Sequence, residues 1–158
     1  MNHTLIKSIF FLIALLTAAS PAEAQKVKIS ASGGWNFTIG VSDLASGPGS
    51  DIADRDSSPS ATLLTVTAKG SSWVVNVIRS DTSWNGNLAL SVRRNSDGTG
   101  SGIVNGGTSF IPVGVTNSLF FSGSESRSNI GIQYRQKSPL KVPPGSYSTT
   151  VIYTITQQ

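Results

Sequence analysis

The last apolar segment, residues 142–158, constrains the fold of this chain most strongly. From position 147 to 155, the odd-numbered positions carry aromatic and β-branched side chains, namely Tyr147, Thr149, Val151, Tyr153 and Ile155. The even-numbered positions from 146 to 156 carry Ser and Thr, interrupted only by Ile152. This two-residue period predicts a strand with one buried face and one face in water. A single strand cannot bury its own face, so the rest of the chain is expected to supply an opposing sheet.

Similar alternation recurs along most of the chain. It predicts strands within residues 27–41, 61–68, 72–79, 88–94, 109–115, 119–121 and 129–136. Together with the last segment, this gives about eight or nine strands, typical of an antiparallel two-sheet β-sandwich of the Ig-like or fimbrial-like kind. Gly33-Gly34 interrupts the first alternation and predicts a bend, and Trp35 is expected in the core beside Phe37 and Ile39.

Turn residues set expectations for the connections. Residues 42–60 are rich in Gly, Pro, Ser and Asp and predict one long loop. An Asn85-Gly86 hairpin would set polar residues against an apolar face, so a wider connection over residues 81–87 is expected, with Trp84 near its tip. Asp97-Gly98 predicts a two-residue hairpin that pairs Val92 with Ile103.

The N-terminal segment has the pattern of an export signal. Lys7 precedes an apolar run over residues 9–19, and Ala22-Glu23-Ala24 has the small-x-small form of a cleavage site. The alternatives are a membrane anchor, for which the run is short, and a buried helix. We expect cleavage after Ala24, a single domain over residues 25–158, and a secreted, periplasmic or cell-surface protein with no integral membrane segment after cleavage.

The composition of the expected mature chain argues against catalysis. The sequence has no Cys, and His3 and Met1 are its only His and Met. Neither a His/Cys zinc site nor a Ser–His or Cys–His pair can then be built. The expectation is a protein that is not an enzyme and has no cofactor. A hydrolase built on Asp residues is the remaining catalytic alternative.

The charge balance excludes one class of partner. The formal net charge is +4, and the Lys and Arg residues are scattered without a block of like charge. No nucleic-acid partner is therefore expected. Weak attraction to an acidic polysaccharide or an anionic envelope is compatible with this charge.

The closing sequence VPPGSYSTTVIYTI resembles the last strand of bacterial secreted β-sandwich surface subunits of the spore-coat-U and fimbrial kind. The resemblance covers residues 142–158: a Pro/Gly turn, an aromatic residue and alternating Thr, Val and Tyr. The chain departs from the pattern in having no Cys pair and in ending with Gln157-Gln158 in place of a penultimate Tyr. The resemblance implies a building block of a surface or appendage.

Three groups of residues are candidates for binding. Asp51, Asp54 and Asp56, with Asp43 nearby, offer oxygen ligands for calcium, although a solvated polar loop explains the same residues. Trp84, with Arg79 and Arg93, is a candidate patch for a sugar or a protein partner; the alternative is that Trp84 caps the sandwich. Val27, Ile29 and Ala31, in the arm of residues 25–32, are candidates for strand exchange with a neighbouring subunit; an ordinary first strand is the alternative.

These observations favour an exported structural or adhesive surface component that acts through protein–protein contacts, by self-association or with other surface proteins. The alternative is a non-catalytic carbohydrate-binding module that uses Trp84 or Trp35.

Overall fold

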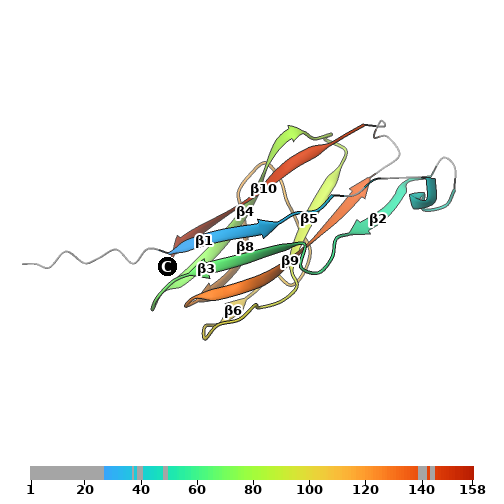
Figure 1. Ribbon diagram of the computed structural model, residues 1–158. Helices are drawn as coiled ribbons and strands as arrows, with labels where there is room; N and C mark the ends of the chain where they lie inside the picture. Colours follow the sequence, from blue (N-terminus) through green and yellow to red (C-terminus); the bar gives the residue numbers. More distant parts are fainter. Residues whose placement is uncertain (1–26, 37, 39–40, 48–49, 139–141, 143–144) are drawn as a thin grey trace, which may run out of the picture.

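The computed structural model describes residues 27–36, 38, 41–47, 50–138, 142 and 145–158. These residues form ten β-strands in two antiparallel sheets and one 3-10 helix, η1 (Val41–Asp43), with no α-helix among them (Figure 1). The predicted two-sheet β-sandwich is therefore confirmed. No helix in this part of the chain is long and apolar enough to cross a membrane.

The larger sheet has six strands. Across it lie β1 (Lys28–Gly33), β3 (Thr62–Thr67), β9 (Arg127–Ser138), β5 (Ala89–Arg94) and β7 (Ile111–Pro112), while β2 (Ile52–Asp56) pairs with the later part of β9. The long strand β9 thus holds the sheet together, pairing with β3 and β2 along one side and with β5 along the other.

The smaller sheet has four strands. Their order is β10 (Ser148–Gln157), β4 (Ser72–Ser83), β8 (Ser118–Ser124) and β6 (Val104–Asn105). The first strand of the chain and the last therefore lie at edges of different sheets. A cleft, described below, lies between these two edge strands.

The core lies between the sheets and is built by the predicted alternation. The largest fully buried side chains are Trp73, Phe121, Leu64, Ile130, Ile132, Val66, Val75, Val77 and Val92. Trp73 and Phe121 meet edge to face with their ring centroids 5.9 Å apart. The indole Nε1 of Trp73 donates a hydrogen bond to the carbonyl oxygen of Glu125 at 2.8 Å, so the ring is buried with its polar group satisfied.

The predicted bend in the first strand occurs at Gly33, where β1 ends. Gly33 has a φ of 99°, and a Cβ there would collide with the carbonyl oxygen of Ala61. Trp35, just beyond the bend, is half-buried and packs against the core. Phe37 and Ile39, predicted to accompany it, lie outside the described residues.

The predicted pairing of Val92 with Ile103 is wrong. Val92 pairs with Ile111 on one side and with Tyr134 on the other, whereas the side chain of Ile103 is 66% exposed. The two-residue hairpin predicted at Asp97-Gly98 does not form, although Gly98 has a φ of 66°. Thr99, after it, bridges Ser128 and so continues the direction in which β5 runs along β9. The chain then crosses to the other sheet, where Val104 pairs with Gly123.

Two predicted loops are also shorter than expected. Residues 42–60 contain η1 and β2, so this stretch is only partly a loop. Strand β4 continues to Ser83, so the predicted connection over residues 81–87 begins later. No two-residue hairpin forms at Asn85-Gly86, as predicted, but the wider hairpin expected in its place is wrong, because β4 and β5 belong to different sheets.

Candidate functional site

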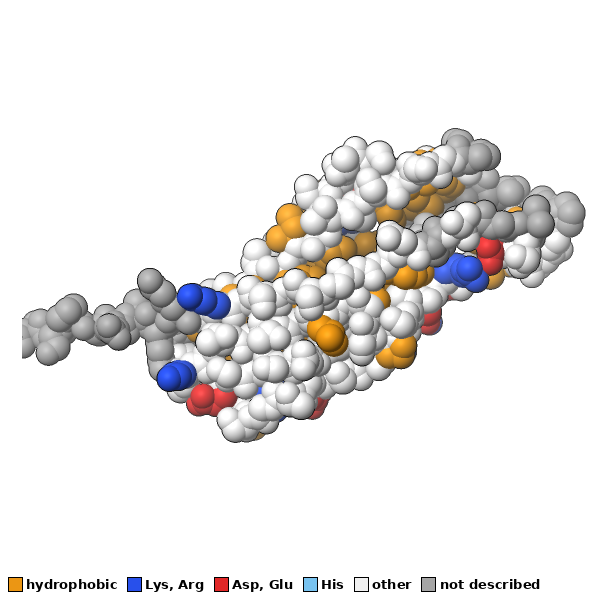
Figure 2. Space-filling model, viewed as in Figure 1, with side chains coloured by type: hydrophobic (Ala, Val, Ile, Leu, Met, Phe, Trp, Pro, Cys, Tyr) orange, Lys and Arg blue, Asp and Glu red, His pale blue; other side chains and the backbone are white. Residues whose placement is uncertain are grey.

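A cleft of about 400 Å³ opens between the two edge strands β1 and β10. The strands contact each other, and Figure 1 shows them diverging toward the end of β1. Figure 2 shows hydrophobic side chains exposed along the furrow between the two sheets. The lining residues are Ala31, Gly33, Gly34, Trp35, Asn36, Thr62, Trp84, Leu90, Tyr134, Gln136, Tyr147, Ser148, Thr149, Thr150, Val151 and Tyr153.

The inward face of β10 is only partly covered: its inward side chains are half-buried. Tyr153 and Ile155 contrast in this respect with their register partners on β4, Val77 and Val75, which are fully buried. Among the strands that the structure describes, β1 and β10 each have one outer edge without a neighbour in their sheet. Backbone groups along such an edge are free to pair with an added strand.

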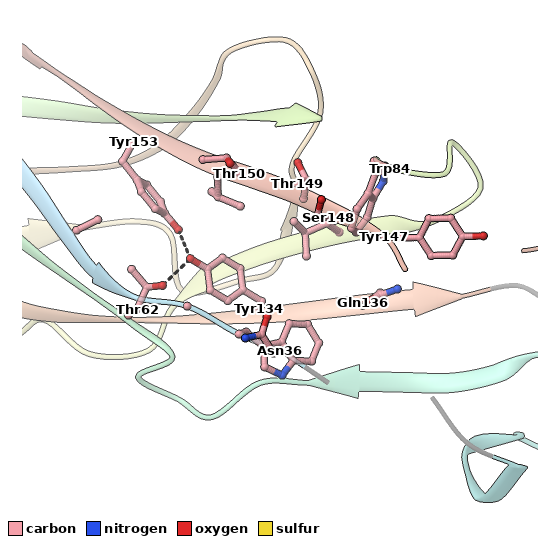
Figure 3. Close-up of a pocket in the computed structure, with 16 residues that line it drawn as sticks. Asn36, Thr62, Trp84, Tyr134, Gln136, Tyr147, Ser148, Thr149, Thr150 and Tyr153 are labelled. Atoms are coloured by element: carbon pink, nitrogen blue, oxygen red, sulfur yellow. Dashed lines mark hydrogen bonds between the residues drawn. The ribbon is translucent and has the colours of Figure 1, made fainter. Parts of the chain in front are cut away.

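Three hydroxyl groups join the two sheets at the floor of the cleft. The hydroxyl of Tyr134 shares a hydrogen bond with Thr62 Oγ1 at 2.8 Å and another with the hydroxyl of Tyr153 at 3.0 Å. Figure 3 shows the three groups pointing toward one another from β3, β9 and β10. Burial raises the pKa of Tyr153 well above its ordinary value, and the neighbouring Tyr134 raises it further. The Tyr153 hydroxyl is therefore neutral at physiological pH.

The structure brings together two of the three residues in the predicted Trp84 patch. The guanidinium of Arg79 lies 5.3 Å from the ring centroid of Trp84, which is a cation–π contact. The indole Nε1 of Trp84 donates to the carbonyl oxygen of Leu88 at 3.1 Å. Trp84 is half-buried at one end of the sandwich and also lines the cleft. This position of Trp84 is compatible with both of its predicted alternative roles, capping the sandwich and binding a sugar or a protein partner.

Arg93, the third residue of that patch, lies elsewhere. It belongs to β5 in the six-stranded sheet, and its guanidinium stacks over Phe110 with 4.6 Å to the ring centroid. Trp84 follows β4 in the other sheet. Closeness along the chain suggested one hairpin, but the two strands belong to opposite layers.

The candidate calcium ligands are engaged with cations rather than gathered around one point. Their ion pairs are Asp43–Arg55 at 3.0 Å, Asp54–Lys137 at 3.2 Å and Asp56–Arg135 at 2.7 Å. Asp51 also has an interaction partner. Within the described part of the chain, no three His, Cys, Asp or Glu residues cluster in a way that could hold a metal ion.

The strand-exchange candidates form the first strand of the chain's own sandwich in this structure. Strand β1 pairs antiparallel with β3 from Lys28↔Thr67 to Gly33↔Thr62, which places Ile29 beside Val66 and Ala31 beside Leu64. Val27 and Ile29 are half-buried and Ala31 is exposed. Apart from Ile29, the residues of β1 are therefore exposed.

Several cleft residues were not predicted as site residues. Tyr153 was named only for its place in an alternating strand, and Tyr134, Asn36 and Gln136 were not singled out. The signal available in the sequence was the row of polar aromatic residues at buried positions, since Tyr at such positions needs a hydrogen-bond partner. Which partner it finds depends on strands that are far apart in the chain.

The side chains that line the cleft are suited to apolar contacts and neutral hydrogen bonds. Its lining residues are aromatic, aliphatic, hydroxyl-bearing or amide-bearing, and none of them carries an ionisable carboxylate, amine or guanidinium. Such a surface can bury apolar groups and exchange neutral hydrogen bonds. Comparison of the chain with protein-family models, with curated proteins and with solved structures finds no match.

Proposed function

We propose that this protein is an exported structural or adhesive component of a cell surface that acts through protein–protein contacts. In this proposal the cleft between β1 and β10 accepts an extended segment of a partner as an added strand. The observation that carries the proposal is a cleft of mixed apolar and hydroxyl-bearing lining that lies between the outer edges of two edge strands among the described residues.

Strand addition uses both features of the cleft. Main-chain hydrogen bonds to a free edge supply affinity, and alternate side chains of the added strand fill the pocket below. The half-buried Tyr153 and Ile155 would gain the cover that their register partners Val77 and Val75 already have, and the half-buried Val151 would be covered as well. The added apolar burial would stabilise the complex by about 25 cal/mol for each Å² removed from water.

Export is the second part of the proposal and rests on the N-terminal sequence. Lys7, the apolar run of residues 9–19 and Ala22-Glu23-Ala24 have the order of a cleavable leader. The absence of Cys means that the exported fold would rely on its core and its partners alone.

A segment of a second copy is the partner that we test first. The arm of residues 25–32 contains Val27, Ile29 and Ala31 in an alternating row that suits a pocketed groove. A synthetic peptide of this sequence is expected to bind the protein that starts at Gln25. A peptide with Ser at those three positions is the control and is expected not to bind.

The variant G34W blocks the cleft specifically. Apart from chain neighbours, no atom lies within 4 Å of where a Cβ would sit at Gly34, so the indole can occupy the cleft mouth without clashing at its base. Gly86 is equally open but lies outside the cleft, so G86W is the matched control. We expect G34W to abolish peptide binding and concentration-dependent assembly, and G86W to retain both.

Size-exclusion chromatography with light scattering, over a range of concentrations, measures the assembly. A protein that stays monomeric at every concentration and binds no extended peptide would refute strand addition. Assembly that G34W leaves intact would place the contact on another surface.

Carbohydrate binding is the second candidate function. The observation that favours it is that Trp35 and Trp84, considered separately from the sequence, line the same cleft together with Asn36 and Gln136. Aromatic faces with nearby amides suit pyranose rings. Titration with neutral oligosaccharides while tryptophan fluorescence is recorded tests this function, and the absence of any shift would remove it.

A further inference from the structure

Two arginines stack against one phenylalanine on the outer face of the six-stranded sheet. The guanidinium carbons of Arg93 and Arg135 lie 4.6 Å and 4.2 Å from the ring centroid of Phe110. Both arginines occupy outward positions, since their neighbours Val92 and Tyr134 are buried in the core. This cluster lies on a different surface from the cleft and none of its residues lines it.

The two guanidinium groups differ in how many of their nitrogens donate hydrogen bonds. Arg135 donates from Nε and Nη2 to the two carboxylate oxygens of Asp56, at 2.7 Å and 2.8 Å, so its fork is occupied. Toward the residues that the structure describes, the guanidinium of Arg93 donates from Nε alone, to Gln133 Oε1 at 2.8 Å. Among the described residues, Arg93 forms no ion pair with a carboxylate. Its two terminal nitrogens are therefore available as a bidentate donor.

The side chain of Arg93 is held in place by Gln133, its register partner on β9. The side chain of Gln133 is buried, with 6% of the residue exposed, and its Nε2 donates to the carbonyl oxygen of Ser57 at 2.8 Å. This bond orients the Gln133 oxygen that receives Arg93. With the Phe110 ring on its other side, the guanidinium is positioned before any ligand arrives.

The charges around the cluster leave one cation in excess. Asp56 neutralises Arg135 and Asp54 neutralises Lys137, whereas Arg93 has no such partner in the described residues. We propose that Arg93 binds a carboxylate of an acidic polysaccharide, with the terminal guanidinium nitrogens as donors and Phe110 and Arg135 as the frame that orients them.

The position of the cluster favours a polysaccharide over an acidic peptide. Arg93 and Arg135 lie on β5 and β9, which are inner strands whose backbone groups pair with neighbours on both sides. An extended peptide gains much of its affinity from main-chain bonds to a free edge. A uronic acid polymer uses its carboxylates and hydroxyls, which side chains on a sheet face can reach.

Isothermal titration of the chain from Gln25 with oligogalacturonate tests the proposal. R93Q and R93K are each expected to weaken binding about tenfold or more, because a charge-assisted bidentate contact depends on the planar fork. K69Q is the matched control: it removes one positive charge at the exposed turn between β3 and β4, and it should change the affinity less than about twofold. G34W should bind as the unmodified protein does, since the cleft is not involved.

Circular dichroism verifies that each variant is folded. Equal weakening by R93Q and K69Q would overturn the proposal, because attraction by net charge alone would explain it. Full affinity in R93K would overturn it as well, since the fork would then be unnecessary. Equal binding of a carboxyl-reduced oligosaccharide, or of polyglutamate in place of oligogalacturonate, would also contradict it.

Discussion

The hydroxyl of Tyr134 in the six-stranded sheet lies 3.0 Å from the hydroxyl of Tyr153 in the four-stranded sheet, directly beneath the cleft. Tyr134 also bonds Thr62, so its single hydroxyl connects two strands of its own sheet to the opposite layer. A polar contact at this depth fixes the relative position of the two sheets. It also places hydrogen-bonding groups among the lining residues of the cleft.

Removing the central hydroxyl is expected to cost more stability than removing the outer one. Y134F leaves both Thr62 Oγ1 and the Tyr153 hydroxyl without this partner, whereas Y153F leaves the Tyr134–Thr62 bond intact. We expect Y153F to lower the free energy of unfolding by about 1 kcal/mol and Y134F by about 2 kcal/mol. Urea denaturation measures both, and equal costs would contradict the network.

Gly123 makes room for the buried Trp73. A Cβ at this position would lie 2.5 Å from Cζ2 and Cη2 of the indole, and Trp73 has no exposed surface. G123A is therefore expected to destabilise the fold by about 1–3 kcal/mol or more, because the ring must shift in a close-packed core. G86A, where the space is open, is the control and should be nearly neutral. Thermal unfolding followed by tryptophan fluorescence distinguishes the two.

The ion pair of Asp56 and Arg135 makes a small, pH-dependent contribution to stability. Its hydrogen bond with Arg135 holds the pKa of Asp56 below its ordinary value of 3.8, against a smaller opposing effect of burial. A lowered pKa in the folded state stabilises the protein above pH 3.8, and this effect is lost as the pH falls through the folded pKa.

The D56N variant tests that contribution. Both side chains are 35% exposed, so solvent screening limits the cost of D56N near neutral pH to about 0.2–1 kcal/mol. The difference from the unmodified protein should shrink as the pH falls well below 3.8 and as salt is added. A difference that is constant across pH would show that the charge of Asp56 is not its source.

Inward-facing valines on neighbouring strands are expected to behave differently. Val77 is fully buried on β4, whereas Val151 on β10 is half-buried and lines the cleft. V77A should therefore cost about 2 kcal/mol of unfolding free energy and V151A less than half of that, since a covered site leaves the larger cavity. For binding of an added strand the order should reverse, because only Val151 contacts the cleft. Peptide titration and urea denaturation of both variants provide the comparison.

Much of the fold could be predicted from local patterns. The alternation in residues 147–155 predicted a strand with one buried and one wet face, and β10 has the alternating burial that this implies. The strand predicted within residues 72–79 places Trp73, Val75 and Val77 on one face by the same alternation, and all three are fully buried. These predictions are confirmed because the side-chain period of a strand is a property of its backbone and needs no partner.

Pairing could not be predicted in the same way. Val92 is followed by a turn that pointed to Ile103, yet it pairs with Ile111 and Tyr134. Asp56 was assigned to a loop, yet it lies in β2 opposite Arg135 of β9. In each case the partner lies well beyond the nearest turn in the sequence, where several apolar strands of similar pattern compete for the same place.

The sequence by itself therefore determined that the fold is all-β and which face of most strands is buried. It also determined that the expected mature chain contains no Cys or His. Only the tertiary structure decided that β1 and β10 lie at edges of opposite sheets, that Trp35 and Trp84 share one cleft, and that Arg93 stands with Phe110 and Arg135. The physical reason is that periodicity is encoded by neighbours two residues apart, whereas a site in a sandwich is assembled by long-range packing between layers.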